Sequence, residues 1–301
     1  MNPPVILVAG SANLDFVVRA ARIPAPGETV LGREFRTFPG GKGANQAIAC
    51  ARAGGAATQM LLALGNDAFA IPLEASLREA GVILHIVRAE HEPTGTAFIC
   101  VSDDAENAIT VAPGANARLA RQHLPPLTGV SHLLLQLETP IASVTAYARD
   151  AHAAGVTVVL NGAPAAPLPR ELLAALDLLI VNEGELATIS GIASDVDAAI
   201  AAMDVRCVVV TLGARGARAR CGAAHFSQPG FAVQAVDTTA AGDTFCGALV
   251  AELGRDAGWP GALRFACAAA ALACTKAGAQ TSIPTREEVL AFLQTQPAPQ
   301  A

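Results

Sequence analysis

Short apolar runs rich in Val, Leu and Ile alternate along this chain with longer, alanine-rich stretches. The apolar runs are residues 5–10, 58–64, 132–136, 156–160, 178–181 and 207–211. Their length and composition are typical of buried strands. The helical stretches are residues 43–53, 68–80, 141–154 and 171–175. Strand and helix alternating at this spacing predict an α/β fold with a mostly parallel sheet and helices on both faces.

Two segments depart from this alternation, at about residues 14–38 and 84–111. They contain extended runs such as Thr96-Ala97-Phe98-Ile99-Cys100-Val101 and no good helix. We expect antiparallel strands set apart from the main sheet as a small lid, although extra edge strands on the same sheet would give the same pattern. No fixed-period repeat or composition break divides the chain, so we expect a single domain over residues 1–301.

Composition and charge narrow the class of protein. The chain is 52% hydrophobic and 15% charged, which is typical of a folded globular protein and not of a disordered one. The formal net charge is -6 and no basic run occurs. Nucleic acid is therefore not an expected partner, because binding to a phosphate backbone depends on clustered Lys and Arg.

Cysteine spacing and the N-terminal residues bear on the cellular compartment. The 7 cysteines are scattered and never form a C-x-x-C pair, which favours reduced, mostly buried thiols over a disulfide framework or a zinc site. The N-terminus has no basic segment and too short an apolar run for a signal peptide. The longest apolar helix candidate, residues 265–274, is about half the ~20 residues that a membrane span needs. We expect a soluble, cytoplasmic protein without a membrane partner.

The most informative segment is residues 237–245, Asp-Thr-Thr-Ala-Ala-Gly-Asp-Thr-Phe, which leads into a predicted helix. Small residues before a helix allow several backbone N–H groups to point at one place, and the helix dipole favours negative charge there. Asp243 would then lie beside a bound phosphate without binding it, as a base acting on a hydroxyl group requires. The alternative is structural, because Asp is a common N-cap and Gly a common turn residue.

Two further segments carry hydrogen-bonding groups suited to a polyhydroxylated ligand. Residues 38–47 include Gly41, Lys42 and Asn45 at a helix start, and the glycine spacing matches neither a P-loop nor a dinucleotide fingerprint. Alternation places Asn13 and Asp15 on one side of the chain after the first strand. A glycine-rich turn and an Asx-turn are the structural alternatives.

Three other positions follow predicted strands, where open α/β sheets place ligand contacts. Glu138 follows residues 132–136, and residues 211–216 follow the strand that ends there, where they could wrap a nucleotide or form a hairpin turn. Asn182 and Glu185 have i,i+3 spacing, which fits a magnesium or phosphate role but also a helix capping box.

Together these segments resemble the ribokinase-like (PfkB) carbohydrate kinase family over residues 5–292. The matching segments, in the family's order, are G-S-x-N-x-D at 10–15, G-G-K-G-A-N-Q-A at 40–47, L-E-T-P at 137–140, N-x-x-E at 182–185, T-L-G-x-R-G at 211–216 and D-T-x-A-A-G-D-T-F at 237–245. The resemblance implies a Rossmann-like domain with a β-sheet lid that closes over a sugar and forms a homodimer interface.

The resemblance also implies roles for individual residues, with ATP and Mg²⁺ as cofactors. Asp243 would be the catalytic base, and the amides of Ala240, Ala241, Gly242 and Asp243 would form the anion hole. The sugar would be held by Asn13, Asp15, Gly41, Lys42, Gly43, Asn45, Glu138 and Asp243, with Ala97 and Ile99 of the lid over its ring. ATP would contact Asn182, Thr211, Gly213, Gly216, Gly242 and Cys267. Glu185 would act on Mg²⁺ indirectly.

A monovalent cation, K⁺, is implied beside the anion hole. The matching positions are Asp237, Thr239, Ala273, Lys276, Gly278 and Ser282, which would bind it mostly through backbone carbonyls. One departure from the family's pattern is Cys267, because a member of the family carries a His at this position on the nucleotide side of the site.

The expected activity is the ATP-dependent phosphorylation of a small sugar, with D-ribose and its 5-hydroxyl favoured by the G-G-K-G-A-N and L-E-T-P segments. Kinases of deoxyribose, fructose or adenosine are alternatives within the family, as is a non-catalytic sugar-binding descendant. A nicotinamide-dependent oxidoreductase is disfavoured by the missing dinucleotide fingerprint.

Overall fold

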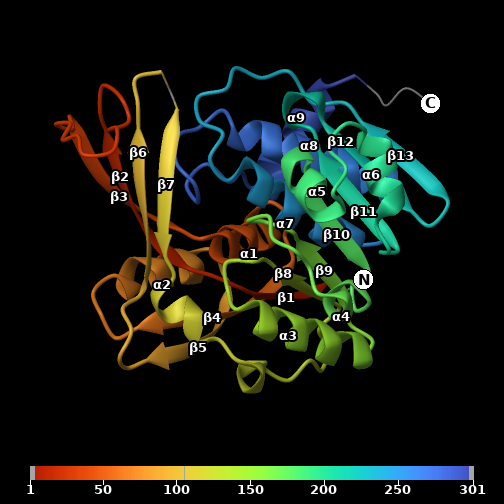
Figure 1. The fold of residues 1–301 in the computed structure, drawn as a ribbon. Coiled ribbons are helices and arrows are strands. Elements are labelled where there is room, and N and C mark those ends of the chain that lie inside the picture. The colour runs from red at the N-terminus through yellow and green to blue at the C-terminus, as the bar shows by residue number, and fades with distance from the viewer. Residues whose placement is uncertain (1–3, 105, 298–301) are drawn as a thin grey trace.

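The computed structural model describes residues 4–104 and 106–297, and its largest feature is a nine-stranded sheet (Figure 1). In spatial order its strands are β13 (Ala224–Gln228), β12 (Ala217–Cys221), β11 (Cys207–Thr211), β10 (Leu178–Asn182), β9 (Thr157–Asn161), β8 (His132–Leu135), β1 (Val5–Ala9), β4 (Ala57–Gly65) and β5 (Ile83–Ala89). All neighbours from β11 to β5 are parallel, and β12 and β13 add an antiparallel edge. The predicted mostly parallel sheet is confirmed.

Helices cover both faces of this sheet. They are α1 (Lys42–Arg52), α2 (Ala70–Glu79), α3 (Ile141–Ala153), α4 (Arg170–Leu173), α5 (Glu183–Ser190), α6 (Val196–Ala202), α7 (Ala241–Leu253), α8 (Gly258–Ala273) and α9 (Arg286–Thr295), with 3-10 turns η1 (Gly114–Arg118), η2 (Arg121–His123) and η3 (Gly213–Arg215). Side chains of α1, α2, α7, α8 and α9 form one apolar core, and those of α3, α4, α5 and α6 form the other. In β1, Ile6 and Val8 enter the first core and Leu7 and Ala9 the second. This two-sided burial explains why the strands are continuous apolar runs.

A second, four-stranded sheet stands apart from the first, in the order β3 (Glu34–Gly40), β2 (Asn13–Arg19), β6 (Gly95–Val101) and β7 (Asn107–Ala112) (Figure 1). Two of its pairings are antiparallel, whereas β2 and β6 run parallel. The predicted segment 84–111 therefore divides. Residues 83–89 pair with β4 as the edge strand β5 of the main sheet, and only the part from Gly95 onward belongs to the small sheet.

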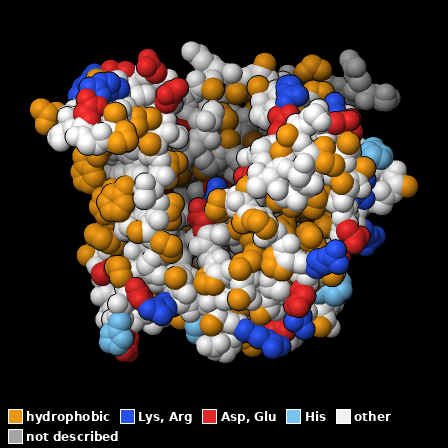
Figure 2. Space-filling model, viewed as in Figure 1, with side chains coloured by type: hydrophobic (Ala, Val, Ile, Leu, Met, Phe, Trp, Pro, Cys, Tyr) orange, Lys and Arg blue, Asp and Glu red, His pale blue; other side chains and the backbone are white. Residues whose placement is uncertain are grey.

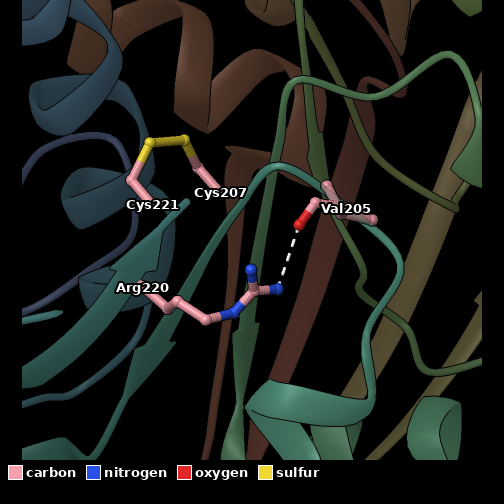
Figure 3. Close-up of a disulfide and its surroundings, with 4 residues drawn as sticks. All are labelled: Val205, Cys207, Arg220 and Cys221. Carbon is pink, nitrogen blue, oxygen red and sulfur yellow. Dashed lines mark hydrogen bonds between the residues drawn. A yellow bond between two sulfur atoms is a disulfide. The ribbon is translucent and has the colours of Figure 1, made fainter. Parts of the chain in front are cut away.

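The cysteines differ from the prediction at one pair. Cys207 and Cys221 form a disulfide, with Cα atoms 4.1 Å apart, because the β11–β12 register places them directly opposite each other (Figure 3). Sequence separation did not reveal this cross-strand contact. Beside it, Arg220 Nη2 donates to the carbonyl oxygens of Val205 and Met203, both at 3.0 Å. The other five cysteines are free thiols.

No helix within residues 4–104 and 106–297 is both long and apolar enough to cross a membrane.

Candidate active site

Polar side chains meet where the carboxyl ends of the parallel strands face the small sheet. Figure 2 shows this region as a hollow with acidic and basic side chains on its floor. Helices α1 and α7 both begin here, so their N-terminal turns point into the same space. The arrangement is the ligand position that is general for open α/β sheets.

The residues predicted to form the anion hole lie at the N-terminus of α7, where the Ala241 amide already donates to the Thr238 carbonyl oxygen at 3.2 Å. Ala240, the N-cap, has φ 58 and ψ 10, and the cap makes no side-chain hydrogen bond to the helix. In the described part of the chain the amides of Gly242 and Asp243 have no acceptor. A Cβ added to Gly242 would meet nothing within 4 Å. Free N–H groups therefore border open space, as an oxyanion or phosphate group requires.

Asp243 lies on the first turn of α7 and is only 8% exposed. Its Oδ2 accepts a hydrogen bond from Asn45 Nδ2 and its Oδ1 one from Gln46 Nε2, each at 2.9 Å. Burial raises the pKa of Asp243, while the Lys42 ammonium and these two amide donors oppose that rise. A buried carboxylate held by donors on both oxygens can remain ionised and accept a proton.

Asn13 and Asp15 face the hollow from β2, as alternation predicted, and Asp15 lies within the strand rather than in an Asx-turn. Asn13 Oδ1 accepts a hydrogen bond from Asn116 Nδ2 at 2.8 Å. Among the described residues, no hydrogen bond contributes to the electrostatic environment of the Asp15 carboxylate. Burial, followed by the negative charges of Glu138 and Asp243, raises the pKa of Asp15 to about 7.

Glu138 connects three parts of the site. Its Oε2 accepts a hydrogen bond from Ser11 Oγ at 2.6 Å and from the Lys42 amide at 3.1 Å. The Ser11 hydroxyl in turn accepts one from the Gly43 amide at 3.3 Å. Ser11 and Asn116 were not predicted as site residues; Ser11 lies inside the G-S-x-N-x-D segment, whereas Asn116 comes from η1 and gave no sequence signal.

Lys42 borders a cavity of about 150 Å³ that Asp243 and the predicted nucleotide contacts Asn182 and Thr211 also line. The cavity is lined by Lys42, Asn161, Ala163, Ile180, Val181, Asn182, Glu185, Thr211, Ala240, Gly242, Asp243 and Cys246. The negative charge of Asp243 raises the pKa of Lys42 most, with smaller effects from Glu138 and Glu185, against the opposing effect of burial. A cation that no single carboxylate neutralises is suited to a ligand that carries further negative charge.

The N-x-x-E segment forms the capping box that was the structural alternative. The Glu185 amide donates to Asn182 Oδ1 and the Asn182 amide to Glu185 Oε2, both at 2.8 Å. Burial raises the pKa of Glu185, opposed by the Asn182 amide and by Lys42. Thr211 lies beside Asn182 in register, and Gly213 and Gly216 lie in the β11–β12 hairpin with positive φ. The Asn182 and Glu185 side chains therefore form the capping box and also line the cavity, where a ligand can reach them.

The predicted cation positions lie in the segment after β13 and at or beyond the end of α8, and a hydrogen bond to Asp237 links the two segments. The Asp237 carboxylate accepts hydrogen bonds from the Thr239 and Gly278 amides, both at 2.9 Å. The Lys276 ammonium instead pairs with Glu288 at 2.8 Å. Among the described residues, three or more His, Cys, Asp or Glu side chains do not gather anywhere as a metal site.

Three predicted positions remain, of which Ala97 and Ile99 lie on the small sheet and Cys267 lies in the apolar core. Ala97 pairs in register with Asp15, and Ile99 lies two residues further along β6, so both lie on the face of the small sheet that carries Asn13 and Asp15. Cys267 lies in α8 within the apolar core and does not line the cavity, and burial raises its pKa to about 12. The structure thus does not bring Cys267 to the other predicted nucleotide contacts.

The chain is similar in sequence to known carbohydrate kinases. The model of the family described as pfkB family carbohydrate kinase matches residues 4–286. The ribokinase of Haemophilus influenzae is 41% identical, over 96% of this chain and 98% of its own length. The ribokinase of Bacillus subtilis is 37% identical, over 94% of this chain and 97% of its own.

Solved structures give the same likeness. A ribokinase from Thermotoga maritima has a TM-score of 0.86 at 36% identity, covering 97% of this chain and 100% of that one. An Arabidopsis thaliana ribokinase complexed with ribose and ATP has a TM-score of 0.89 at 33% identity, covering 98% of this chain and 100% of that one.

Proposed function

The chain belongs to the pfkB family of carbohydrate kinases, and we propose that it transfers the terminal phosphoryl group of ATP to the 5-hydroxyl of D-ribose. Relatives described as ribokinases match nearly the whole chain, and one solved relative is complexed with ribose and ATP. One observation carries the proposal. The buried Asp243 carboxylate lies on the helix turn whose free amides border the cavity.

Ribose would lie between the small sheet and the starts of α1 and α7. Each sugar hydroxyl both donates and accepts, and the site offers Asp15 as acceptor, Asn13 and Asn45 as amides and Lys42 as donor. Asn45 Oδ1 is buried without a partner among the described residues, so it provides one further acceptor. Gly41, with φ 91, lets the backbone approach closely, because an added Cβ would lie 2.7 Å from the Asn13 amide nitrogen.

The transfer step follows from this placement. The 5-hydroxyl oxygen forms a bond to the γ-phosphorus while the bond from that phosphorus to the β,γ-bridging oxygen breaks, and ADP leaves. Asp243 accepts the hydroxyl proton, a role that typically contributes about 10²–10⁴-fold. The free amides at the start of α7 and the Lys42 ammonium stabilise the charge on the transferring group.

ATP would occupy the adjoining half of the cavity, beside Asn182, Thr211 and the hairpin glycines. Glu185 faces this half and is oriented by its capping box, so it can hold water molecules of an Mg²⁺ shell. Mg²⁺ would neutralise phosphate charge. The loops at 237–239 and 273–282 would hold K⁺ through backbone oxygens, next to the anion hole.

The small sheet would act as the lid and as a homodimer interface. Excluding water protects ATP from hydrolysis, and Ala97 and Ile99 lie on the face toward the sugar. The outward face carries Phe35 and Phe98, which are 60% and 54% exposed. Figure 2 shows apolar side chains gathered on the left, over this sheet and α2. Such a patch on a sheet is suited to a second copy of the chain. We also propose a cytoplasmic location, where ATP is available.

The direct test is ADP production from ATP with ribose, deoxyribose, fructose or adenosine, each with and without K⁺. We expect the highest kcat/KM with ribose and a gain from K⁺. Asp243→Asn should lower kcat by about 10²–10⁴-fold or more while ribose still protects the protein in a thermal-shift assay. Near-normal turnover of this variant would contradict the proposed base.

A further inference from the structure

A chain of buried side-chain amides runs from the main sheet to Asp243, and the transfer step above does not use it. Gln46 Nε2 donates to Asp243 Oδ1 and to Asn161 Oδ1, both at 2.9 Å. Gln46 Oε1 accepts from Gln136 Nε2 at 2.7 Å. All four side chains are buried, with Gln46 and Gln136 at 0% exposure. Water therefore does not compete for these hydrogen bonds.

The orientation of the amide groups in this hydrogen-bonded series is set by one backbone group, the carbonyl of Ile180. Asn161 Nδ2 donates to the carbonyl oxygen of Ile180 at 3.1 Å, and a carbonyl oxygen can only accept. Asn161 must therefore present its Oδ1 to Gln46, and Gln46 must present its NH₂ group. Both hydrogens of that NH₂ are then used, one on Asn161 and one on Asp243. A flipped Gln46 would place its oxygen against two acceptors.

We propose that Gln46 is a positioning residue for Asp243, locked by Asn161 and Gln136 so that an N–H always faces the carboxylate of the base. The inference rests on the proposed function and extends it beyond the residues that touch substrate. Gln46 contributes no group to the sugar or to ATP. It holds one carboxylate oxygen in place and stabilises the ionised form, which is the form that accepts the hydroxyl proton.

Several charged groups also act on Asp243, and the test must separate Gln46 from them. Lys42 on α1 favours the ionised carboxylate, whereas Asp15 on β2, Glu138 after β8 and Glu185 on α5 carry like charge. Cys246, one turn further along α7, is a buried neutral thiol, because burial raises its pKa. Replacing Gln46 by a neutral residue leaves all of these groups in place.

The experiment is the pH profile of kcat, at saturating ribose and ATP, for the wild type and Gln46→Met. Methionine has a similar volume and lacks the amide. Loss of a hydrogen bond to a charged group should move the acidic limb of the profile upward by about 1–2 pH units. The matched control is Gln59→Met, which removes a side-chain hydrogen bond to His85 near the N-terminal end of β4, away from the site. This variant should leave the acidic limb unchanged.

Gln136→Met provides the second variant, because it keeps the Gln46 bonds to Asn161 and Asp243 and removes only the donor that holds Gln46 Oε1. A smaller upward shift is expected, and this variant decides the question by the same criterion if Gln46→Met does not fold. An unchanged acidic limb in the folded variants would overturn the proposal. So would a fall in kcat that is uniform across pH, because that indicates a packing defect.

A readout without substrate separates this inference from the proposed function. Titration of the Asp243 carboxyl carbon by NMR should show a higher midpoint in Gln46→Met than in the wild type. If ribose is not turned over but this midpoint rises, the proposed substrate fails and the positioning role stands. If ribose is turned over and the midpoint is unchanged, the positioning role fails.

Discussion

At the scale of single residues, the carboxyl groups of Asp243, Glu138 and Asp15 in the hollow differ in the hydrogen-bond donors that reach them. Asp243 has a hydrogen-bond donor on each oxygen, and Glu138 accepts from Ser11 and from the Lys42 amide. Asp15 has neither, which is why burial and the two like charges raise its pKa to about 7. No donor opposes the effect of burial on the Asp15 carboxyl group, so this group is expected to titrate near neutral pH.

The pH dependence of sugar binding should report this group. In the proposed complex, ribose hydroxyls would donate to the ionised form of Asp15, so protonation would compete with binding as the pH falls through about 7. The KM for ribose in the wild type should be constant above this range and rise by roughly tenfold for each further pH unit below it. In Asp15→Asn the KM should be higher at pH 8 and nearly independent of pH. A flat wild-type KM between pH 8 and pH 6 would show that Asp15 does not titrate there.

At the scale of elements, the contact between α1 and α7 decides whether Asp243 reaches its donors. Asn45 and Gln46 are adjacent on α1, and one carboxylate from α7 bridges both. The helices approach closely at Gly247, one turn after Asp243. A Cβ there would lie 2.5 Å from Ala49 Cβ and 2.7 Å from the Gln46 carbonyl oxygen. Glycine is required at this position for a packing reason and not for a turn.

Gly247→Ala should therefore separate the two helices and lengthen the hydrogen bonds to Asp243. We expect a loss of about 1–3 kcal/mol in the free energy of unfolding, as for other overpacked cores, and a lower kcat. Denaturant unfolding and steady-state kinetics measure the two effects. The control is Gly261→Ala in α8, where the nearest atom to an added Cβ, on Ala257, is 4.0 Å away. There the helix should be unchanged or slightly more stable.

At the scale of the whole molecule, the site exists only because two sheets face each other. The large sheet and its helix α7 supply the proposed base, the proposed anion hole and the cavity, and the small sheet supplies Asn13 and Asp15. Phe16 on the outward face of the small sheet stacks on Phe35 and Phe98, with ring centroids 6.0 and 5.4 Å apart. This outward aromatic surface carries the proposed homodimer.

Phe98→Glu should convert a dimer into a monomer, because it places a charge in the middle of the apolar surface without entering the hollow. Sedimentation velocity at micromolar concentration measures this change. Thr295→Glu, on α9, adds the same charge elsewhere on the exposed surface and should leave the mass unchanged. A wild-type chain that sediments as a monomer would remove the basis for the dimer.

The sequence by itself determined the sheet-and-helix alternation and the positions of Asp243, Asn13, Asp15, Lys42 and Asn45, because both follow from local patterns of apolar, glycine and polar residues. It also contained Gln46, inside the motif, but not its role. That role depends on Asn161 and Gln136, which are 115 and 90 residues away in the chain.

The tertiary structure alone decided which sheet residues 83–89 join, that Cys207 faces Cys221, and that Cys267 lies in the core. Strand register and helix packing set these outcomes, and both are contacts between segments far apart in the chain. Local composition carries little information about such contacts. The residues proposed for catalysis could therefore be found from motifs in the sequence, whereas the hydrogen bonds to Asp243 could not.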